Sequence, residues 1–79
     1  MQDFLAGVQG ALQNAFAISP QAVTLETRPE DIPDWDSVGH LSLVSHLEQA
    51  FGISLDVDDI MEMESVRDIV RVVQSKLRV

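Results

Sequence analysis

Apolar residues recur at every third or fourth position in three stretches of the chain, and this spacing places them on one face of a helix. The first stretch predicts a helix over about residues 3–17. The second predicts a helix that begins at residues 36–37 and runs to about residue 50. The third predicts a helix that opens at residues 65–66 and continues to residue 77.

Two of these helices have terminal residues that suit helix caps. Gly52 follows the second helix, and glycine readily takes the left-handed conformation after a last helical turn. Ser65 stands three residues before Asp68, which is the spacing of a capping box at the start of the last helix. A further short helix is predicted at residues 58–61.

A long loop separates the first two predicted helices. The apolar pattern fails over residues 24–36, where it is interrupted by two prolines and by the acidic residues Glu26, Glu30, Asp31 and Asp34. Leu25, Ile32 and Trp35 stand among these acids, and we expect them to anchor the loop so that it is ordered. Ser19 and Pro20 suit the start of one more short turn before it.

Together these elements predict an all-α domain over residues 1–79, a small four-helix bundle with three main helices and one short one. The β-branched residues at 69–73 would also suit a strand, but the sequence offers no strand to pair with them, so a helix is favoured. A chain of 79 residues forms one small domain and has little room for a deep active-site cleft.

Composition and charge narrow the classes of function. The chain has thirteen acidic and five basic residues, a net charge of −8, and no cysteine. Such an acidic chain disfavours nucleic acids and anionic lipids and favours partners with basic surfaces. With no signal peptide and no apolar run of about 20 residues, we expect a soluble cytoplasmic protein without membrane insertion. Without cysteine, thiol chemistry requires a prosthetic group.

Ser37 stands at the predicted start of the second helix, and two interpretations are open there. Asp36 and Ser37 suit an N-cap pair, whose oxygens accept hydrogen bonds from the first backbone N–H groups. A phosphate attached to Ser37 would also be stabilised by those N–H groups and by the helix dipole. Asp36 would then help to hold a divalent cation during the transfer. The local pattern fits both interpretations.

The residues around Ser37 carry a family resemblance. Residues 35–41 read Trp-Asp-Ser-Val-Gly-His-Leu, aliphatic residues follow, and residues 47–53 read Leu-Glu-Gln-Ala-Phe-Gly-Ile. This pattern resembles the signature of acyl carrier proteins. The length, the acidity, the long first loop, the short third helix and the Ser65-Val66 pair extend the resemblance along the whole chain.

The resemblance implies that Ser37 is the attachment site of 4′-phosphopantetheine, which a phosphopantetheinyl transferase takes from coenzyme A with Mg²⁺. Asp36 would assist metal binding in that transferase complex. The arm would hold acyl or aminoacyl groups as thioesters, loaded by an acyl- or aminoacyl-loading ligase and delivered to downstream synthases or acyl-transferring enzymes. The chain itself would be a monomeric, non-catalytic carrier with no metal site of its own.

The second helix departs from the carriers of fatty-acid synthesis. Gly39 and Ser42 occupy positions that are usually acidic there, and Glu48 is the only acid between Ser37 and Phe51. Because exposed charge selects partners, we expect a role other than that of the carrier of fatty-acid synthesis. Residues 35–41 are more similar to the same segment of stand-alone carriers of polyketide, aminoacyl or surface-polysaccharide pathways. Leu41 and Met63 suit either the core or a docking face. The expected docking face comprises Val38, Leu41, Ser42, Ser45, Met61, Glu62, Met63 and Glu64.

His40 and His46 suggest weaker alternatives. Ser37 with His40 three residues later would suit a hydrolase, but such a site also needs an orienting carboxylate and an oxyanion hole. Histidines six residues apart do not share one helix face as a metal-binding pair does. We expect both at the surface or its boundary, with His40 near the phosphate of the arm. The competing class of function is an unmodified acidic adaptor that only docks onto a basic partner.

Overall fold

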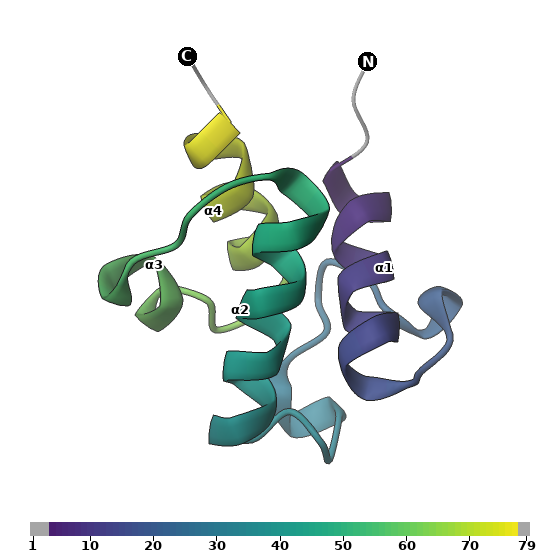
Figure 1. Ribbon diagram of the computed structural model, residues 1–79. Coiled ribbons are helices and arrows are strands. Elements are labelled where there is room, and N and C mark those ends of the chain that lie inside the picture. The colour runs from purple at the N-terminus through teal and green to yellow at the C-terminus, as the bar shows by residue number, and fades with distance from the viewer. Residues whose placement is uncertain (1–3, 78–79) are drawn as a thin grey trace.

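The computed structural model describes residues 4–77, and all regular elements within that range are helical (Figure 1). Two of them are short 3-10 helices, η1 (Pro20–Ala22) and η2 (Pro29–Asp31). The predicted all-α four-helix bundle is confirmed, and residues 69–73 are helical. Asp3, the predicted first residue of the first helix, lies outside the described residues. The α-helices are α1 (Phe4–Phe16), α2 (Ser37–Phe51), α3 (Val57–Met61) and α4 (Val66–Leu77).

The two ends of α2 are set by the residues that flank it. Asp36 is the N-cap, and its Oδ1 accepts a hydrogen bond from the Gly39 N–H at 2.8 Å. At the other end Gly52 adopts a φ of 64°, and its N–H donates to the Glu48 carbonyl. This left-handed conformation ends the helix and satisfies a carbonyl of the last turn.

Both α3 and α4 begin with side-chain caps. The Asp56 carboxylate accepts from the Asp59 N–H at 3.0 Å, and the Asp59 carboxylate accepts from the Asp56 N–H at 3.1 Å. The Ser65 hydroxyl accepts from the Asp68 N–H at 3.3 Å, as the predicted cap requires. Because Asp56 is its N-cap, the short helix α3 begins at Val57, one residue before its predicted start.

The long loop is bonded to the first turn of α4. The Val66 N–H donates to the Thr27 carbonyl at 2.9 Å, and the Arg67 N–H donates to the Leu25 carbonyl at 3.0 Å. The first N–H groups of a helix have no partner inside the helix, so the loop supplies their acceptors. These bonds fix the loop against α4 and order it as predicted.

The core lies where α1, α2 and α4 meet, and the loop contributes to it. Ile32 and Trp35 are 7% and 4% exposed, so these two predicted anchors are buried, whereas Leu25 is half-buried against the core. Gly7 lets the Phe51 ring approach α1, because a Cβ there would lie 2.5 Å from its Cζ. The other core residues are Val8, Ala11, Leu12, Phe16, Val23, Leu43, Val44, Leu47, Met63, Val66, Ile69, Val72 and Val73.

Figure 1 shows α2 in the middle of the molecule, with α1 on one side, α3 on the other and α4 behind. The Glu48 carboxylate accepts from the Leu55 N–H at 2.8 Å, which holds the segment before α3 to α2. The Lys76 Nζ lies 2.6 Å from the Asp59 carboxylate, which holds α3 to α4. The first turn of α2 lies at the lower end of the molecule, next to the long loop (Figure 1).

Candidate functional site

Ser37 is the first residue of α2 and is exposed at the lower end of the molecule. Asp36 is also exposed, and its carboxylate caps the helix through Gly39. The N-cap interpretation is confirmed for Asp36, while Ser37 lies one residue further along, inside the first turn. The Ser37 hydroxyl is thus open to solvent at the positive end of the dipole of α2.

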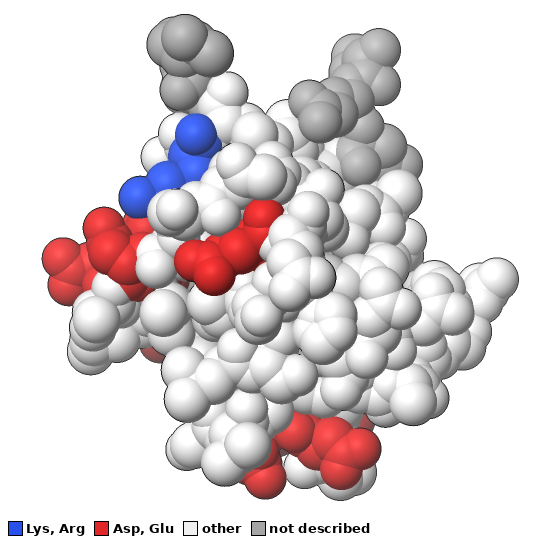
Figure 2. Space-filling view, viewed as in Figure 1, with Lys and Arg blue, Asp and Glu red and all other residues white. Residues whose placement is uncertain are grey.

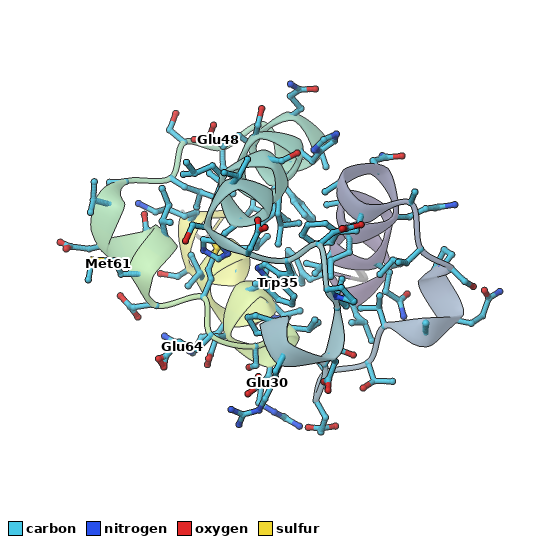
Figure 3. All side chains as sticks on the ribbon, turned by 90° about the horizontal axis from the view of Figure 1, so that it is seen from below. Glu30, Trp35, Glu48, Met61 and Glu64 are labelled. Atoms are coloured by element: carbon cyan, nitrogen blue, oxygen red, sulfur yellow. The ribbon has the colours of Figure 1, made fainter. Side chains whose placement is uncertain are left out.

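An open hollow of about 790 Å³ lies beside Ser37. Figure 3 shows the molecule from this end. Trp35 lies near the middle of the view, and Glu30, Met61 and Glu64 lie closer to the edge of the molecule. The size falls within the range of small-molecule sites, roughly 300–1,000 Å³. Its lining comes from the long loop, the first turn of α2, α3 and the segment after α3: Arg28, Pro29, Glu30, Trp35, Asp36, Ser37, His40, Leu41, Ile60, Met61, Met63 and Glu64.

One side chain in the hollow, His40, bridges the loop and α3. The Trp35 Nε1–H donates to the His40 Nδ1 at 2.8 Å, and the His40 Nε2 lies 3.0 Å from the Ile60 carbonyl oxygen. An indole nitrogen only donates, so the Nδ1 must accept and the Nε2 must carry the proton that is donated to Ile60. Both ring nitrogens of His40 are therefore hydrogen-bonded within the protein, one turn after Ser37.

The acidic residue Glu64 at the rim of the hollow differs from the acidic residues beside α4, which are paired with arginines of that helix. Figure 2 shows acidic side chains over α3 and at the lower end of the molecule, with a mostly uncharged surface between them. On α4, Arg71 pairs with Glu62 at 3.2 Å and Arg67 pairs with Glu26. Among the described residues, no basic side chain lies within ion-pair distance of Glu64 on the rim. A basic partner can therefore approach Glu64 without breaking an internal ion pair.

The ion pair between α3 and α4 shifts the pKa values of both partners. The hydrogen bond from the Lys76 ammonium lowers the pKa of the Asp59 carboxyl below its ordinary value. The same hydrogen bond raises the pKa of Lys76. The hydrogen bond between Arg71 and Glu62 likewise raises the pKa of Arg71. Asp59, Lys76 and Arg71 therefore stay charged at neutral pH. Their ion pairs hold α3 and its C-cap residue, Glu62, against α4.

Comparison with known proteins identifies the family. A family model described as "Phosphopantetheine attachment site" matches residues 6–73, which include the whole site. The chain belongs to this family. It is 26% identical over 74 residues to a protein of Renibacterium salmoninarum named "Acyl carrier protein", and the match covers 94% of this chain and 91% of that relative. The resemblance to acyl carrier proteins is thereby confirmed.

Most of the docking face expected for this carrier domain is exposed. Val38, Leu41 and Met61 are 77%, 61% and 72% exposed, so these large apolar side chains are accessible to a partner. Met63 is only 3% exposed and belongs to the core, so it forms part of the floor of the hollow rather than of an exposed face. Ser45, Glu62 and Glu64 are also exposed, whereas Ser42 is half-buried.

The second histidine of the carrier domain lies away from this network. The His46 Nδ1 lies 2.8 Å from the carbonyl oxygen of Ser42, one turn earlier on α2, so His46 is bonded to its own helix. Over residues 4–77, no group of three or more acidic or histidine side chains has the arrangement of a metal site. Within the same range no helix is long and apolar enough to cross a membrane.

The hollow and the His40 bridge were not predicted from the sequence. His40 and His46 are half-buried, as expected for residues at the boundary of the surface, and His40 is bonded to Trp35 and Ile60. A contact between His40 and the phosphate of the arm stays a prediction. One signal was available, because a buried tryptophan needs an acceptor for its N–H. Asp34, Asp36 and Ser37 also carry acceptors and stand nearer to Trp35 along the chain than His40 does, so the sequence could not single out His40.

Proposed function

We propose that Ser37 carries 4′-phosphopantetheine and that the chain delivers acyl or aminoacyl thioesters to partner enzymes. The observation that supports this most directly is an exposed serine at the first position of α2, beside an open hollow, in a chain of the phosphopantetheine-attachment family. The chain has no cysteine, so the thiol of the arm would supply its thioester chemistry.

The residues present fit such a group. In the transfer, the Ser37 hydroxyl loses its proton and forms a bond to phosphorus, while the bond from that phosphorus to the adenosine bisphosphate leaving group breaks. The start of α2 favours the anionic phosphodiester through its dipole and its N–H groups. Asp36 is exposed next to Ser37, where it would help to hold Mg²⁺ in the transferase complex.

The partners would be a phosphopantetheinyl transferase, a loading ligase and a downstream synthase or acyl-transferring enzyme. Val38, Leu41 and Met61 offer apolar contacts, and Glu62 and Glu64 offer charge to a basic partner. Gly39 and Ser42 leave the usual acidic positions of α2 uncharged, which supports a specialised pathway over fatty-acid synthesis. The proposal includes a monomeric protein in the cytoplasm.

Intact mass spectrometry tests this function. The apo protein is incubated with coenzyme A, Mg²⁺ and a transferase of broad specificity, with a known carrier protein as the positive control. We expect the mass of one phosphopantetheine to be added to the wild type and not to Ser37→Ala. If the control is modified and this chain is not, the chain is better described as an unmodified adaptor for a basic partner.

A further inference from the structure

Arg28 differs from the other basic residues that the structure describes. Over residues 4–77, Arg67, Arg71 and Lys76 all lie on α4 and form ion pairs with acidic side chains. Arg28 lies in the long loop, is exposed, and has no acidic side chain of that range within ion-pair distance. The chain has thirteen acidic residues, yet it leaves the charge of this guanidinium available to another molecule.

Arg28 belongs to the surroundings of the proposed attachment site. It lines the open hollow together with Ser37, and Glu64 lines the same hollow. An enzyme that acts on the Ser37 hydroxyl must bring its active site to this serine. Because a protein–protein interface of ordinary size buries roughly 800 Å² on each partner, it would extend over the lining of the hollow. The charged groups of Arg28 and Glu64 would then lose much of their water.

This loss of water determines what the enzyme must provide. A charged group that is covered without an opposite charge is strongly unfavourable, because nothing replaces its hydration. Glu30 also lines the hollow, but its carboxylate is not within ion-pair distance of Arg28. Since the chain pairs neither Arg28 nor Glu64, the compensating charges must come from the enzyme.

We propose that Arg28 is a docking residue that selects enzymes with an acidic group on their docking surface. A carboxylate of the enzyme meets Arg28, and a basic group of the enzyme meets Glu64. This inference rests on the attachment of phosphopantetheine to Ser37, which is the reason that an enzyme covers the hollow. Two contacts of opposite sign fix the orientation of the enzyme, and an enzyme with a uniformly basic docking surface is disfavoured because it repels Arg28.

Charge reversal distinguishes this contact from a general attraction between an acidic chain and a basic partner. The probe is a phosphopantetheinyl transferase that modifies the wild type, and titration calorimetry with the apo protein, without coenzyme A, measures Kd. Arg28→Glu makes a chain of net charge −8 still more negative, so general attraction alone predicts tighter binding. We expect weaker binding instead, by about fivefold or more, because like charges then meet. Binding as tight as that of the wild type, or tighter, would overturn the proposal.

Three control variants separate the charge of Arg28 from other effects. Arg67→Glu makes the same change of charge at an exposed arginine that does not line the hollow, and it should not weaken binding. Arg28→Lys keeps the positive charge and should lose less affinity than Arg28→Glu; an equal loss would contradict a role of the charge. Glu30→Gln should change little, and a loss as large as that of Arg28→Glu would assign the compensation to Glu30 and overturn the proposal. Circular dichroism confirms that each variant is folded.

The reciprocal change on the transferase identifies the acidic group. Aspartates and glutamates around its active site are replaced one at a time by lysine. One replacement should restore binding to Arg28→Glu and weaken binding to the wild type, and the absence of any such replacement would refute the contact. If no transferase modifies the wild type while a control carrier is modified, the attachment to Ser37 fails and the docking proposal fails with it. If the wild type is modified and Arg28→Glu binds equally well, only the docking proposal fails.

Discussion

The carbonyl oxygen of Asp34 fills the space in which a side chain at Gly39 would lie. The Cε1 atom of Phe16 is also near, 3.0 Å from the position of a Cβ at residue 39. Residue 39 must therefore be small for the loop to reach the first turn of α2 and to place Asp36 as its cap. The sequence alone presented Gly39 as a missing acidic residue, whereas the structure gives it a role in packing.

We expect Gly39→Ala to lower the free energy of unfolding by about 1–3 kcal/mol, the usual range for overpacking, because backbone cannot move aside as a flexible side chain can. Gly10→Ala is the matched control, since a Cβ there has no atom within 4 Å. That variant should leave the stability unchanged or raise it by up to about 1 kcal/mol. Urea unfolding monitored by circular dichroism measures the free energy of unfolding of both variants. A Gly39→Ala protein as stable as Gly10→Ala would contradict the close contact at residue 39.

The hydrogen bonds of His40 should also contribute to the free energy of unfolding. In His40→Ala the indole N–H of the buried Trp35 loses its acceptor, and the free energy of unfolding should fall by about 1–3 kcal/mol. Trp35 is the only tryptophan, so its fluorescence in urea reports the transition directly. His46→Ala should have a smaller effect. A ¹⁵N spectrum of the wild type at neutral pH should show His40 protonated on Nε2, and a proton on Nδ1 would exclude the bond to Trp35.

The helices were predictable because their determinants are local. The apolar periodicity, Asp36 at one end of α2 and Gly52 at the other act within a few residues of sequence, and the structure confirms them. The same holds for Ser65 as the cap of α4. The attachment segment was recognisable for the same reason, because its residues are contiguous.

The remaining features depend on contacts between distant segments. His40 and Ile60 are 20 residues apart, and the bond uses a backbone carbonyl, which any residue at position 60 would provide. The loop carbonyls of Leu25 and Thr27 that cap α4 are equally independent of side-chain type. Met63 was ambiguous because an apolar residue beside a short helix suits the core and the surface alike. Only the packed structure distinguishes these possibilities.

Charge reversal tests the docking face. We expect Glu62→Lys and Glu64→Lys to weaken binding of a phosphopantetheinyl transferase more than Glu48→Lys does. Each effect should be up to about fivefold in Kd, because exposed ion pairs contribute about 1 kcal/mol or less. The effect at Glu64 should exceed that at Glu62, whose carboxylate already pairs with Arg71.

Titration calorimetry at low and high salt measures these affinities. The differences should shrink at high salt, because screening weakens exposed charges. Since Glu48 accepts a bond from Leu55, circular dichroism must first confirm that the Glu48 variant is folded. If Glu48→Lys weakens transferase binding more than Glu64→Lys does, and both proteins are folded, Glu64 does not belong to the docking face.

The pair between Asp59 and Lys76 predicts a pH dependence. Lys76 lowers the pKa of the Asp59 carboxyl in the folded state, so the pair stabilises the fold above the ordinary carboxyl pKa. This contribution is lost as the pH falls below about 4, through the lowered folded-state pKa. The raised pKa of Lys76 adds no change near neutral pH, because that contribution is lost only in alkali.

Asp59→Asn should therefore lower the melting temperature by a few degrees at pH 7, and the difference from the wild type should narrow in acid. Asp58→Asn, an exposed carboxyl of the same helix, serves as the control and should change little. Calorimetric melting at several pH values provides the comparison. A difference that persists unchanged at the most acidic pH would show that Asp59 acts through something other than its charge.

Substitutions of Asp36 separate its two roles. Asp36→Ala removes the oxygen that accepts from Gly39, and loss of an N-cap lowers stability by about 0.5–2 kcal/mol. Asp36→Asn keeps an acceptor oxygen, and asparagine is as good an N-cap as aspartate, so its stability should remain close to that of the wild type. It lacks the negative charge that would hold Mg²⁺ in the transferase complex.

We therefore expect Asp36→Asn to keep its melting temperature but to accept phosphopantetheine at least tenfold more slowly, with raised Mg²⁺ partly restoring the rate. Asp36→Ala should lose both stability and rate. The measurement is the time course of intact mass under matched transferase concentrations. If Asp36→Asn is modified as fast as the wild type, Asp36 acts only as the cap of α2. The metal would then be held by the transferase and coenzyme A alone, and only Ser37 would remain of the proposed attachment pair.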